Sequence, residues 1–209
     1  MRPAPDTATA VLRVRGATRG DLPAIAALHA GARAAYHRAR HPGAPFDIPG
    51  EQARWHDAWA RVLDRADAPA LCAERHGTVV GAASYLPHAS TARGEPDRTG
   101  TARPTVALDQ LHVAPAHWGT GVGRALHTAC LRAWHTAGFS RAVLDVLWHN
   151  HRARAFYDRL GWRPDPDRRP APDATHLTLA LDLTGPAPDA PPPEPPEPPE
   201  PPEPPSSGR

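Results

Sequence analysis

Lysine is absent from this chain of 209 residues, and all 24 of its basic residues are arginine. A P-loop needs a lysine directly after its last glycine, so a nucleoside-triphosphate site of that kind is excluded. Cysteine is scarce as well. Cys72 and Cys130 lack the spacing of a disulfide framework, and we expect both to be reduced residues of the core.

Long apolar runs are also missing. The first fifteen residues lack the apolar stretch of a signal peptide, and no segment is long enough to span a membrane. We therefore expect a cytoplasmic protein that does not bind membranes. Hydrophobic residues still make up 40% of the chain, which is enough for the core of one domain at this length.

The C-terminus differs in composition from the rest of the chain. From Gly185 it reads GPAPDAPPPEPPEPPEPPEPPSSGR, with a repeated Pro-Pro-Glu unit that cannot form a core. We predict one domain over residues 1–184 and a disordered Pro/Glu-rich tail over residues 185–209. The tail holds five of the 22 acidic residues and one arginine, so 23 arginines and 17 acidic residues precede it, a net charge of +6. This moderately basic domain suits a polyanionic ligand, but its arginines are too scattered to predict nucleic-acid binding.

The most informative segment is LHVAPAHWGTGVGR, residues 111–124. It predicts the end of a strand, a turn at Pro115 and a glycine-dense loop that opens a helix. Gly119, Gly121 and Gly123 let the backbone approach a bulky ligand, and the free N–H groups at the helix start favour an anion. The segment therefore predicts a phosphate-binding loop. The alternative, a tight turn without a ligand, usually needs only one glycine.

The best-known glycine-rich alternative does not fit these residues. A dinucleotide-binding loop needs Gly-x-Gly followed by a glycine or alanine three residues later. Counted from Gly119 that position is Arg124, and counted from Gly121 it is Leu126. The loop must therefore bind its phosphate in another way.

A second informative segment follows an apolar run of strand length, residues 140–148. Its sequence NHRARAFYDRLGW, residues 150–162, predicts a helix capped by Asn150 and ended by Gly161 as the left-handed residue after the last turn. Tyr157 lies about two helical turns beyond Asn150, so the two are expected on one side. Taken alone, this is an ordinary amphipathic helix with a core tyrosine.

Together the two segments resemble the GNAT superfamily of acetyl-CoA-dependent N-acyltransferases. That family has Val-x-Pro at the end of a strand, here Val113 to Pro115, followed by Arg/Gln-x-x-Gly-x-Gly/Ala. The chain supplies Gly121 and Gly123 of this loop but has Trp118 at the Arg/Gln position. The family's second block, N-x-x-A-x-x-F-Y-x-x-x-G-F/W, is met by Asn150, Ala153, Phe156, Tyr157, Gly161 and Trp162. The resemblance covers roughly residues 11–183.

The resemblance implies an α/β (α+β) fold, with a central mixed, mostly antiparallel, twisted sheet of about six to seven strands flanked by about four helices. The residue patterns predict its elements along the chain. Expected strands are 11–15, 70–75, 78–86, 105–113, 141–148 and 174–182, and expected helices are 21–34, 51–64, 121–137 and 150–160. His76 and Gly77 predict a tight turn between the second and third strands.

The resemblance also implies an activity. The protein would be an N-acetyltransferase that moves an acetyl group from acetyl-CoA to an amine by direct transfer in a ternary complex, without a metal. The acceptor would be a small-molecule amine or a protein amine, and a homodimer is compatible with the family. The alternative is a non-catalytic acyl-CoA-binding sensor or scaffold, against which the presence of Asn150 and Tyr157 argues.

The resemblance assigns the catalytic roles as follows. Tyr157 is expected to protonate the sulfur of departing CoA. Asp109 is the candidate base, acting through a water, because strand alternation puts it on the same side as Leu111. An exposed or salt-bridged aspartate is the equal alternative. His112 is the fallback base, on the opposite side of the strand.

The expected cofactor contacts follow from the same resemblance. They come from the end of the strand 105–113, from the glycine loop and from the helix 150–160. In the loop, backbone N–H groups are expected to provide most of the contacts. The residues are Leu111, His112, Val113, Trp118, Gly119, Thr120, Gly121, Val122, Gly123, Arg124, Asn150 and Tyr157.

The acceptor side is less determined. The resemblance places the polar loop 88–104 near it, together with the section 36–59, whose aromatics include Tyr36, Phe46, Trp55 and Trp59. These rings either contact the acceptor or pack the helices on the sheet.

A metal site is not expected from the histidines of this section. His37 and His41 have the spacing of a helical metal pair, but Pro42 and Gly43 end any helix there, and no third ligand is evident.

Overall fold

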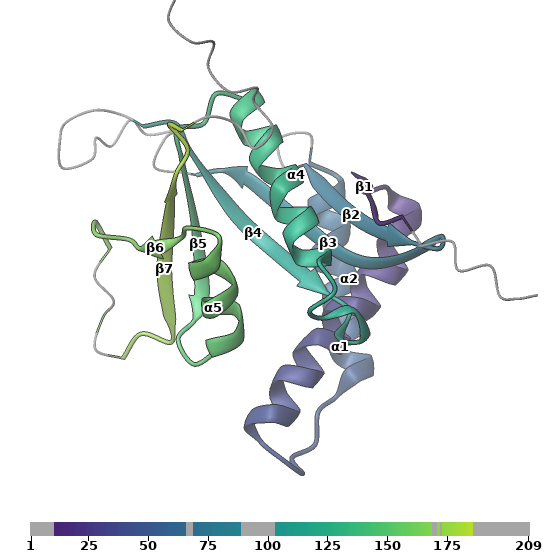
Figure 1. Cartoon of the computed structure of the whole chain (residues 1–209). Coiled ribbons are helices and arrows are strands. Elements are labelled where there is room, and N and C mark those ends of the chain that lie inside the picture. Colours follow the sequence, from purple (N-terminus) through teal and green to yellow (C-terminus); the bar gives the residue numbers. More distant parts are fainter. Residues whose placement is uncertain (1–10, 66–68, 89–102, 169–170, 172, 186–209) are drawn as a thin grey trace, which may run out of the picture.

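The computed structural model describes residues 11–65, 69–88, 103–168, 171 and 173–185. The predicted tail and most of the predicted loop 88–104 lie outside these residues. The described chain forms one twisted, mostly antiparallel sheet in the order β1-β2-β3-β4-β5-β7-β6 (Figure 1). Its strands are β1 (Arg13–Gly16), β2 (Ala70–Arg75), β3 (Thr78–Pro87), β4 (Thr105–Val113), β5 (Arg141–Leu147), β6 (Arg163–Pro164) and β7 (His176–Asp182).

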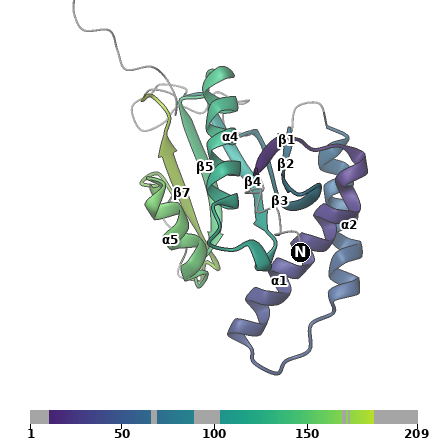
Figure 2. The ribbon, with the colours of Figure 1, turned by 45° about the vertical axis from the view of Figure 1, so that its right-hand side comes forward.

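Four α-helices cover the sheet in the described part of the chain, together with the short 3-10 helices η1 (Arg19–Asp21) and η2 (Pro115–His117). In Figure 2, α1 and α2 lie on one face and α4 and α5 on the other. Two buried clusters match these two layers, one with Leu22, Ile25 and Trp59, the other with Leu126 and Trp134. The α-helices are α1 (Leu22–Arg40), α2 (Ile48–Leu63), α4 (Val122–Thr136) and α5 (His151–Arg159). The predicted fold class is confirmed.

Several predicted boundaries were wrong. Helix α1 continues to Arg40 and does not end at residue 34, because no helix breaker occurs before Pro42. Helix α2 begins at Ile48 and not at residue 51, since the Asp47 carboxylate accepts the N–H of Gly50 at 3.0 Å as a cap. The short strand β6 was not predicted, and β1 begins two residues later than expected.

Strands β4 and β5 are the only parallel neighbours among the described strands, and they pair over a short length. Their register covers Thr105 with Arg141, Val106 with Ala142, and Ala107 with Val143. Beyond this point β4 pairs only with β3, and β5 only with β7. Figure 1 shows the two strands diverging. We call the opening between residues 108–113 and residues 144–147 the wedge.

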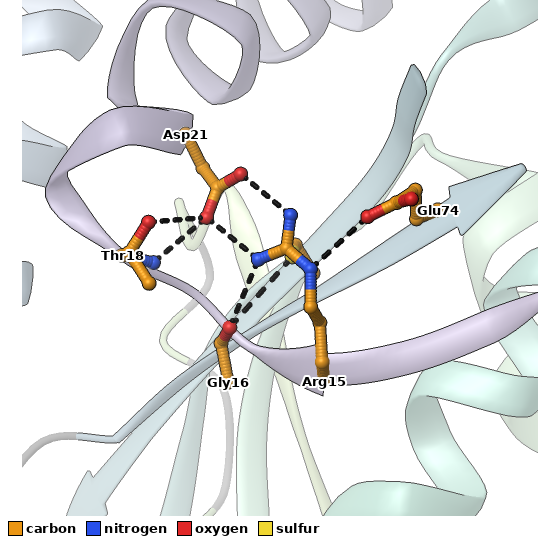
Figure 3. A network of polar contacts seen from close by, with 6 residues as sticks. Arg15, Gly16, Thr18, Asp21 and Glu74 are labelled. Atoms are coloured by element: carbon orange, nitrogen blue, oxygen red, sulfur yellow. Dashed lines mark hydrogen bonds and ion pairs between the residues drawn. The ribbon is translucent and has the colours of Figure 1, made fainter. Parts of the chain in front are cut away.

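A polar network fixes the start of the domain (Figure 3). The Asp21 carboxylate accepts two hydrogen bonds from the Arg15 guanidinium, both at 2.8 Å, and two more from the Thr18 N–H and hydroxyl. Arg15 also donates to Glu74 on β2 at 3.0 Å and to the Gly16 carbonyl. The network ties β1 and the start of α1 to the neighbouring strand. These bonds hold the pKa of Asp21 well below its usual range.

Two buried histidines make the stability of the domain depend on pH. His127 in α4 accepts the indole N–H of Trp162 at 2.9 Å, and His29 in α1 accepts that of Trp59 at 3.1 Å. Both histidines are 1% exposed. Burial lowers the pKa of His127 to about 4 and is the main cause that lowers the pKa of His29 to about 2. Both rings are therefore neutral in the folded protein at neutral pH.

We expect the free energy of unfolding to fall as the pH drops from about 6.5 to about 4. In this range the unfolded chain binds protons that the folded chain does not, at a cost of about 1.4 kcal/mol per pH unit for each histidine. His127→Gln keeps an acceptor for the Trp162 indole but cannot take the proton, so its stability should depend less steeply on pH. Urea unfolding at pH 7, 6 and 5 measures both slopes. Equal slopes would show that His127 does not titrate in this way.

Candidate functional site

The glycine loop adopts the conformation that its sequence predicts. Gly119 has φ +76° and Gly121 has φ +88°, values in the left-handed region that favours glycine. Gly121 is the N-cap residue of α4. A Cβ atom at either glycine would meet nothing within 4 Å, so the space over the loop is open. Here glycine is needed for the backbone conformation.

The backbone N–H groups of residues 119–124 lie in the loop and in the first turn of α4. Within the described residues none of them donates to a backbone acceptor, whereas the N–H of Ala125 donates to the Gly121 carbonyl at 3.0 Å. Helix α4 is 15 residues long and adds the positive end of its dipole. Val122 is 1% exposed and packs into the core, while Arg124 is exposed. The arrangement can hold a phosphate group.

Gly123 has a different role, which the sequence did not predict. A Cβ atom there would lie 3.3 Å from two ring carbons of Phe156 in α5 and 3.7 Å from a methyl group of Val113. The absence of a side chain at Gly123 therefore lets α5 approach the start of α4. The third glycine of the loop is required for packing as well as for an open ligand face.

Arginine side chains border the loop on two sides. The guanidinium of Arg75, at the end of β2, lies 3.4 Å from both the hydroxyl and the carbonyl of Thr120. That of Arg152, in α5, lies over the Trp118 ring with its central carbon 3.7 Å from the ring centroid. Trp118 itself donates its indole N–H to the Val113 carbonyl at 2.8 Å. The sequence singled out neither arginine, because arginines occur throughout the chain.

Asn150 caps α5, as predicted. Its side-chain oxygen accepts the N–H of Ala153 at 3.1 Å, which leaves the amide nitrogen available for another partner. Gly161, which follows α5, has φ +88°, also as predicted. The cap means that Asn150 has a structural role in addition to any contact with a ligand.

Tyr157 lies in the core between α5 and the sheet. It is 8% exposed, and its ring packs edge-on against Phe156 and Trp162 with centroids 5.1 and 5.8 Å away. Burial, with a smaller effect from Cys130 of α4, raises the pKa of the Tyr157 hydroxyl above its ordinary value. The hydroxyl therefore stays protonated at neutral pH, which is the state that a proton donor needs.

The expected position of Asp109 was wrong. Ser84 of β3 is opposite Gln110 and Tyr85 is opposite Leu108, so Asp109 is an extra, unpaired residue that forms a bulge. Its carboxylate lies 3.4 Å from the Ser84 hydroxyl. Ser84 follows the alternation of Ala82, which packs against α1 and α2. Asp109 therefore lies on the α1/α2 face, opposite to Leu111, and is exposed.

The expected position of His112 relative to Asp109 was wrong for the same reason. The bulge puts both on the α1/α2 face. The His112 ring stacks on His29 of α1 with centroids 3.5 Å apart, and its Nε2 lies 2.8 Å from the Gln110 side-chain oxygen. Burial, together with the nearby Arg33, lowers the pKa of His112 to about 4, so the ring is neutral at neutral pH. His112 thus packs against the helix layer and away from α4.

The aromatic residues of section 36–59 mainly pack. Trp59 is 1% exposed in the α1/α2 core, and Trp55 stacks on the other face of His29 at 3.7 Å. Glu51 accepts the Trp55 indole N–H at 2.8 Å and the Arg33 guanidinium at 2.7 Å. For Trp59 the packing interpretation is therefore confirmed. No group of three or more metal-binding side chains occurs among the described residues.

The predicted site residues thus fall into two groups. One group surrounds the wedge on the α4/α5 face: the loop, the strand end with Leu111 and Val113, and α5 with its cap Asn150 and with Tyr157. Asp109 and the His112 side chain lie on the other face of β4. The end of β4, the loop and the start of α5 surround an open face, which we call the cradle, next to an unpaired strand edge.

Comparison with known proteins agrees with this geometry. Residues 30–162 match the family model described as the acetyltransferase (GNAT) family. The chain therefore belongs to the GNAT family of acetyltransferases.

Solved structures show the same fold. PaiA N-acetyltransferase from Thermoplasma acidophilum, in complex with coenzyme A, is 14% identical, with 82% of this chain and 99% of that chain covered and a TM-score of 0.64. The ribosomal-protein-S18-alanine N-acetyltransferase from Escherichia coli is 17% identical, with 86% of this chain and 99% of that chain covered and a TM-score of 0.55. YncA from Salmonella typhimurium, with acetyl-CoA, is 23% identical, with 86% of this chain and 98% of that chain covered and a TM-score of 0.50. In the part of the chain that the structure describes, no helix combines the length and apolar character needed to cross a membrane.

Proposed function

We propose that this protein is an N-acetyltransferase that transfers the acetyl group of acetyl-CoA directly to an amine in a ternary complex. The observation that carries the proposal is the open glycine loop at the end of β4, where the strand has lost its pairing with β5. The loop offers N–H groups to a phosphate, and the strand edge offers backbone groups to an amide chain. A cofactor that joins a pyrophosphate to a pantetheine arm fits both.

The cofactor would lie along the wedge. Its pyrophosphate takes the N–H groups of residues 119–124, and its pantetheine amides bond to the edge of β4 that has no partner strand, near Leu111 and Val113. The Val113 carbonyl on this edge also accepts the Trp118 indole N–H. The amide nitrogen of Asn150 is available to hold the same arm from α5. A backbone N–H near Val113 polarises the thioester carbonyl, where negative charge develops as the amine attacks.

The chemistry then needs two proton movements. The amine nitrogen forms a bond to the carbonyl carbon, and the carbon–sulfur bond breaks as CoA leaves. Tyr157 donates its proton to the sulfur. Asp109 takes the amine proton through a water. A water can reach Asp109 because this residue is exposed on the sheet face that carries α1 and α2. His112 is the less suitable base, since one face of its ring is covered by His29 and its Nε2 is paired with Gln110.

One observation favours the alternative of a non-catalytic acyl-CoA-binding module. Asn150 caps a helix and Tyr157 packs among aromatic rings, so both have structural reasons to be present. The decisive experiment incubates the purified protein with acetyl-CoA and a panel of amines: small polyamines, amino acids and peptides with free N-termini or lysines. Release of CoA and the matching acetylated product by mass spectrometry would support the enzyme. Tight acetyl-CoA binding without transfer to any amine would support the binding module.

Tyr157→Phe tests the chemical step. It keeps the packed ring but removes the proposed proton donor, so acetyl-CoA affinity should barely change while kcat falls about 10- to 100-fold. A higher pH should not restore the rate, because the missing proton comes from the enzyme. Steady-state kinetics on a confirmed acceptor measures this. The matched control is Tyr85→Phe, which removes a hydroxyl from an equally buried tyrosine of the same core cluster and should leave kcat unchanged. Wild-type turnover by Tyr157→Phe would make Tyr157 a packing residue only.

A further inference from the structure

Trp118 occupies the loop position where the GNAT pattern has arginine or glutamine, so the loop lacks a polar side chain of its own. In the structure, a positively charged side chain from another helix lies beside Trp118. The guanidinium carbon of Arg152, in the first turn of α5, lies 3.7 Å from the centroid of the Trp118 ring. The Trp118 indole is fixed in turn by its bond to the Val113 carbonyl. Arg152 therefore extends from α5 to the loop before α4, beside the glycines.

The Arg152 guanidinium is uncompensated in the described structure. It has no carboxylate and no hydrogen-bond acceptor among the described residues, although burial lowers its pKa from the ordinary value. Other arginines of this region are paired: Arg154 donates to the Trp148 carbonyl at 3.1 Å, and Arg163 to Asp158 at 2.6 Å. Stacking on the Trp118 ring uses only the flat face of the guanidinium. Its N–H groups, which lie in the plane, remain free for an anion.

We propose that Arg152, stacked on Trp118, is a ligand of the cofactor pyrophosphate and supplies the charge that residue 118 cannot. The inference rests on the proposed function. The pyrophosphate is the expected partner because Trp118 directly precedes the N–H groups that form the cradle. A guanidinium can bind two phosphate oxygens at once, which suits this group. Arg152 also joins the two sides of the wedge, since it comes from α5 and lies on the loop before α4.

The test compares Arg152→Gln with Arg159→Gln, which removes the same charge from a second exposed arginine of the same helix. Calorimetry with coenzyme A should give a Kd about 10- to 100-fold higher for Arg152→Gln and within about twofold of wild type for Arg159→Gln, by the usual contribution of a charge-assisted hydrogen bond. Arg152→Lys keeps the charge but cannot stack flat on the Trp118 ring. Its Kd should lie between those of wild type and Arg152→Gln.

Two further measurements separate the explanations. Dephospho-coenzyme A lacks only the 3′-phosphate. An equal loss of affinity for both ligands in Arg152→Gln supports the pyrophosphate, whereas a loss for coenzyme A alone overturns this assignment in favour of the 3′-phosphate. Trp118→Leu should weaken binding to a similar degree, and the double variant should be no weaker than either single variant, because the ring acts by holding the guanidinium.

The inference and the proposed function fail in different ways. If wild type binds coenzyme A and Arg152→Gln binds it equally well, Arg152 is not a ligand and the cofactor assignment stands. If Arg152→Gln lowers the melting temperature but not the affinity, the stack is only a structural tie between α5 and the loop. If wild type binds neither coenzyme A nor dephospho-coenzyme A, both proposals are wrong.

Discussion

Gly121→Glu should abolish measurable binding of acetyl-CoA, whereas Gly121→Gln should retain it. Glutamate would put a carboxylate over the loop where the pyrophosphate is proposed to lie, and the two negative charges repel at short distance. We expect a loss of at least about 100-fold in affinity, or about 2.7 kcal/mol. Glutamine has the same shape but no charge, so the comparison isolates the electrostatic effect.

The two variants share every other consequence of the substitution. Both place a side chain at φ +88°, which costs on the order of 1 kcal/mol, and neither meets another atom at its Cβ. Their melting temperatures should therefore agree, and calorimetry with acetyl-CoA on the folded proteins gives the result. Equal affinities for the glutamate variant and wild type would contradict a phosphate site at this loop. Gly123→Asp should also abolish binding, but it is a less clean test because its Cβ would press on Phe156.

Asp21→Ala should be the most destabilising of the single substitutions in the Arg15–Asp21 network. It removes four hydrogen bonds from a carboxylate whose side chain is 10% exposed and leaves the Arg15 guanidinium without its main partner. Breaking such a largely buried pair costs about 3 kcal/mol. Urea unfolding at pH 7 measures the loss. Because the ion pair depresses the pKa of Asp21, its contribution is present above the ordinary value of 3.8 and is lost as the pH falls further, below the histidine range.

The control for Asp21→Ala is Asp64→Ala. Asp64 pairs with Arg19 on the surface, where the side chains are 51% and 63% exposed, so the change should cost less than about 1 kcal/mol. A double-mutant cycle with Arg15→Ala should show strong coupling between Arg15 and Asp21. Additive effects of the two single substitutions would mean that the ion pair itself contributes little and that the Thr18 bonds dominate.

Local residue patterns predicted most of the fold. Strands β2 and β4 begin and end at the predicted residues, because Gly, Pro and the His76–Gly77 turn mark their limits. The N-cap at Asn150 and the left-handed Gly161 were predicted because both depend on neighbours within a few residues. The helix ends at Arg40 and Ile48 were missed. No stop signal occurs between residue 34 and Pro42, so α1 continues to Arg40. The start of α2 does have a local signal, Asp47 followed by Pro49, which the prediction overlooked.

Contacts between distant segments were not predictable. The proximity of Gly123 and Phe156, and of Trp118 and Arg152, depends on how α5 returns to the start of α4. The family resemblance indicated which residues gather at the wedge, but not that Asp109 is an unpaired residue. A bulge depends on the register between two strands, and the alternation of β4 alone gives no sign of it.

The bulge at Asp109 gives this strand one residue that its pairing with β3 does not use. Leu108 and Leu111 face α4 beside Tyr85 and Ala83, although two residues separate them. Deleting Asp109 would therefore leave a regular strand in which Leu111 and His112 keep their present faces. Losing a second residue between Leu108 and Val113 would instead exchange the polar and apolar faces of one part of the strand. Related sequences should thus tolerate the loss of one residue at this point, but not of two.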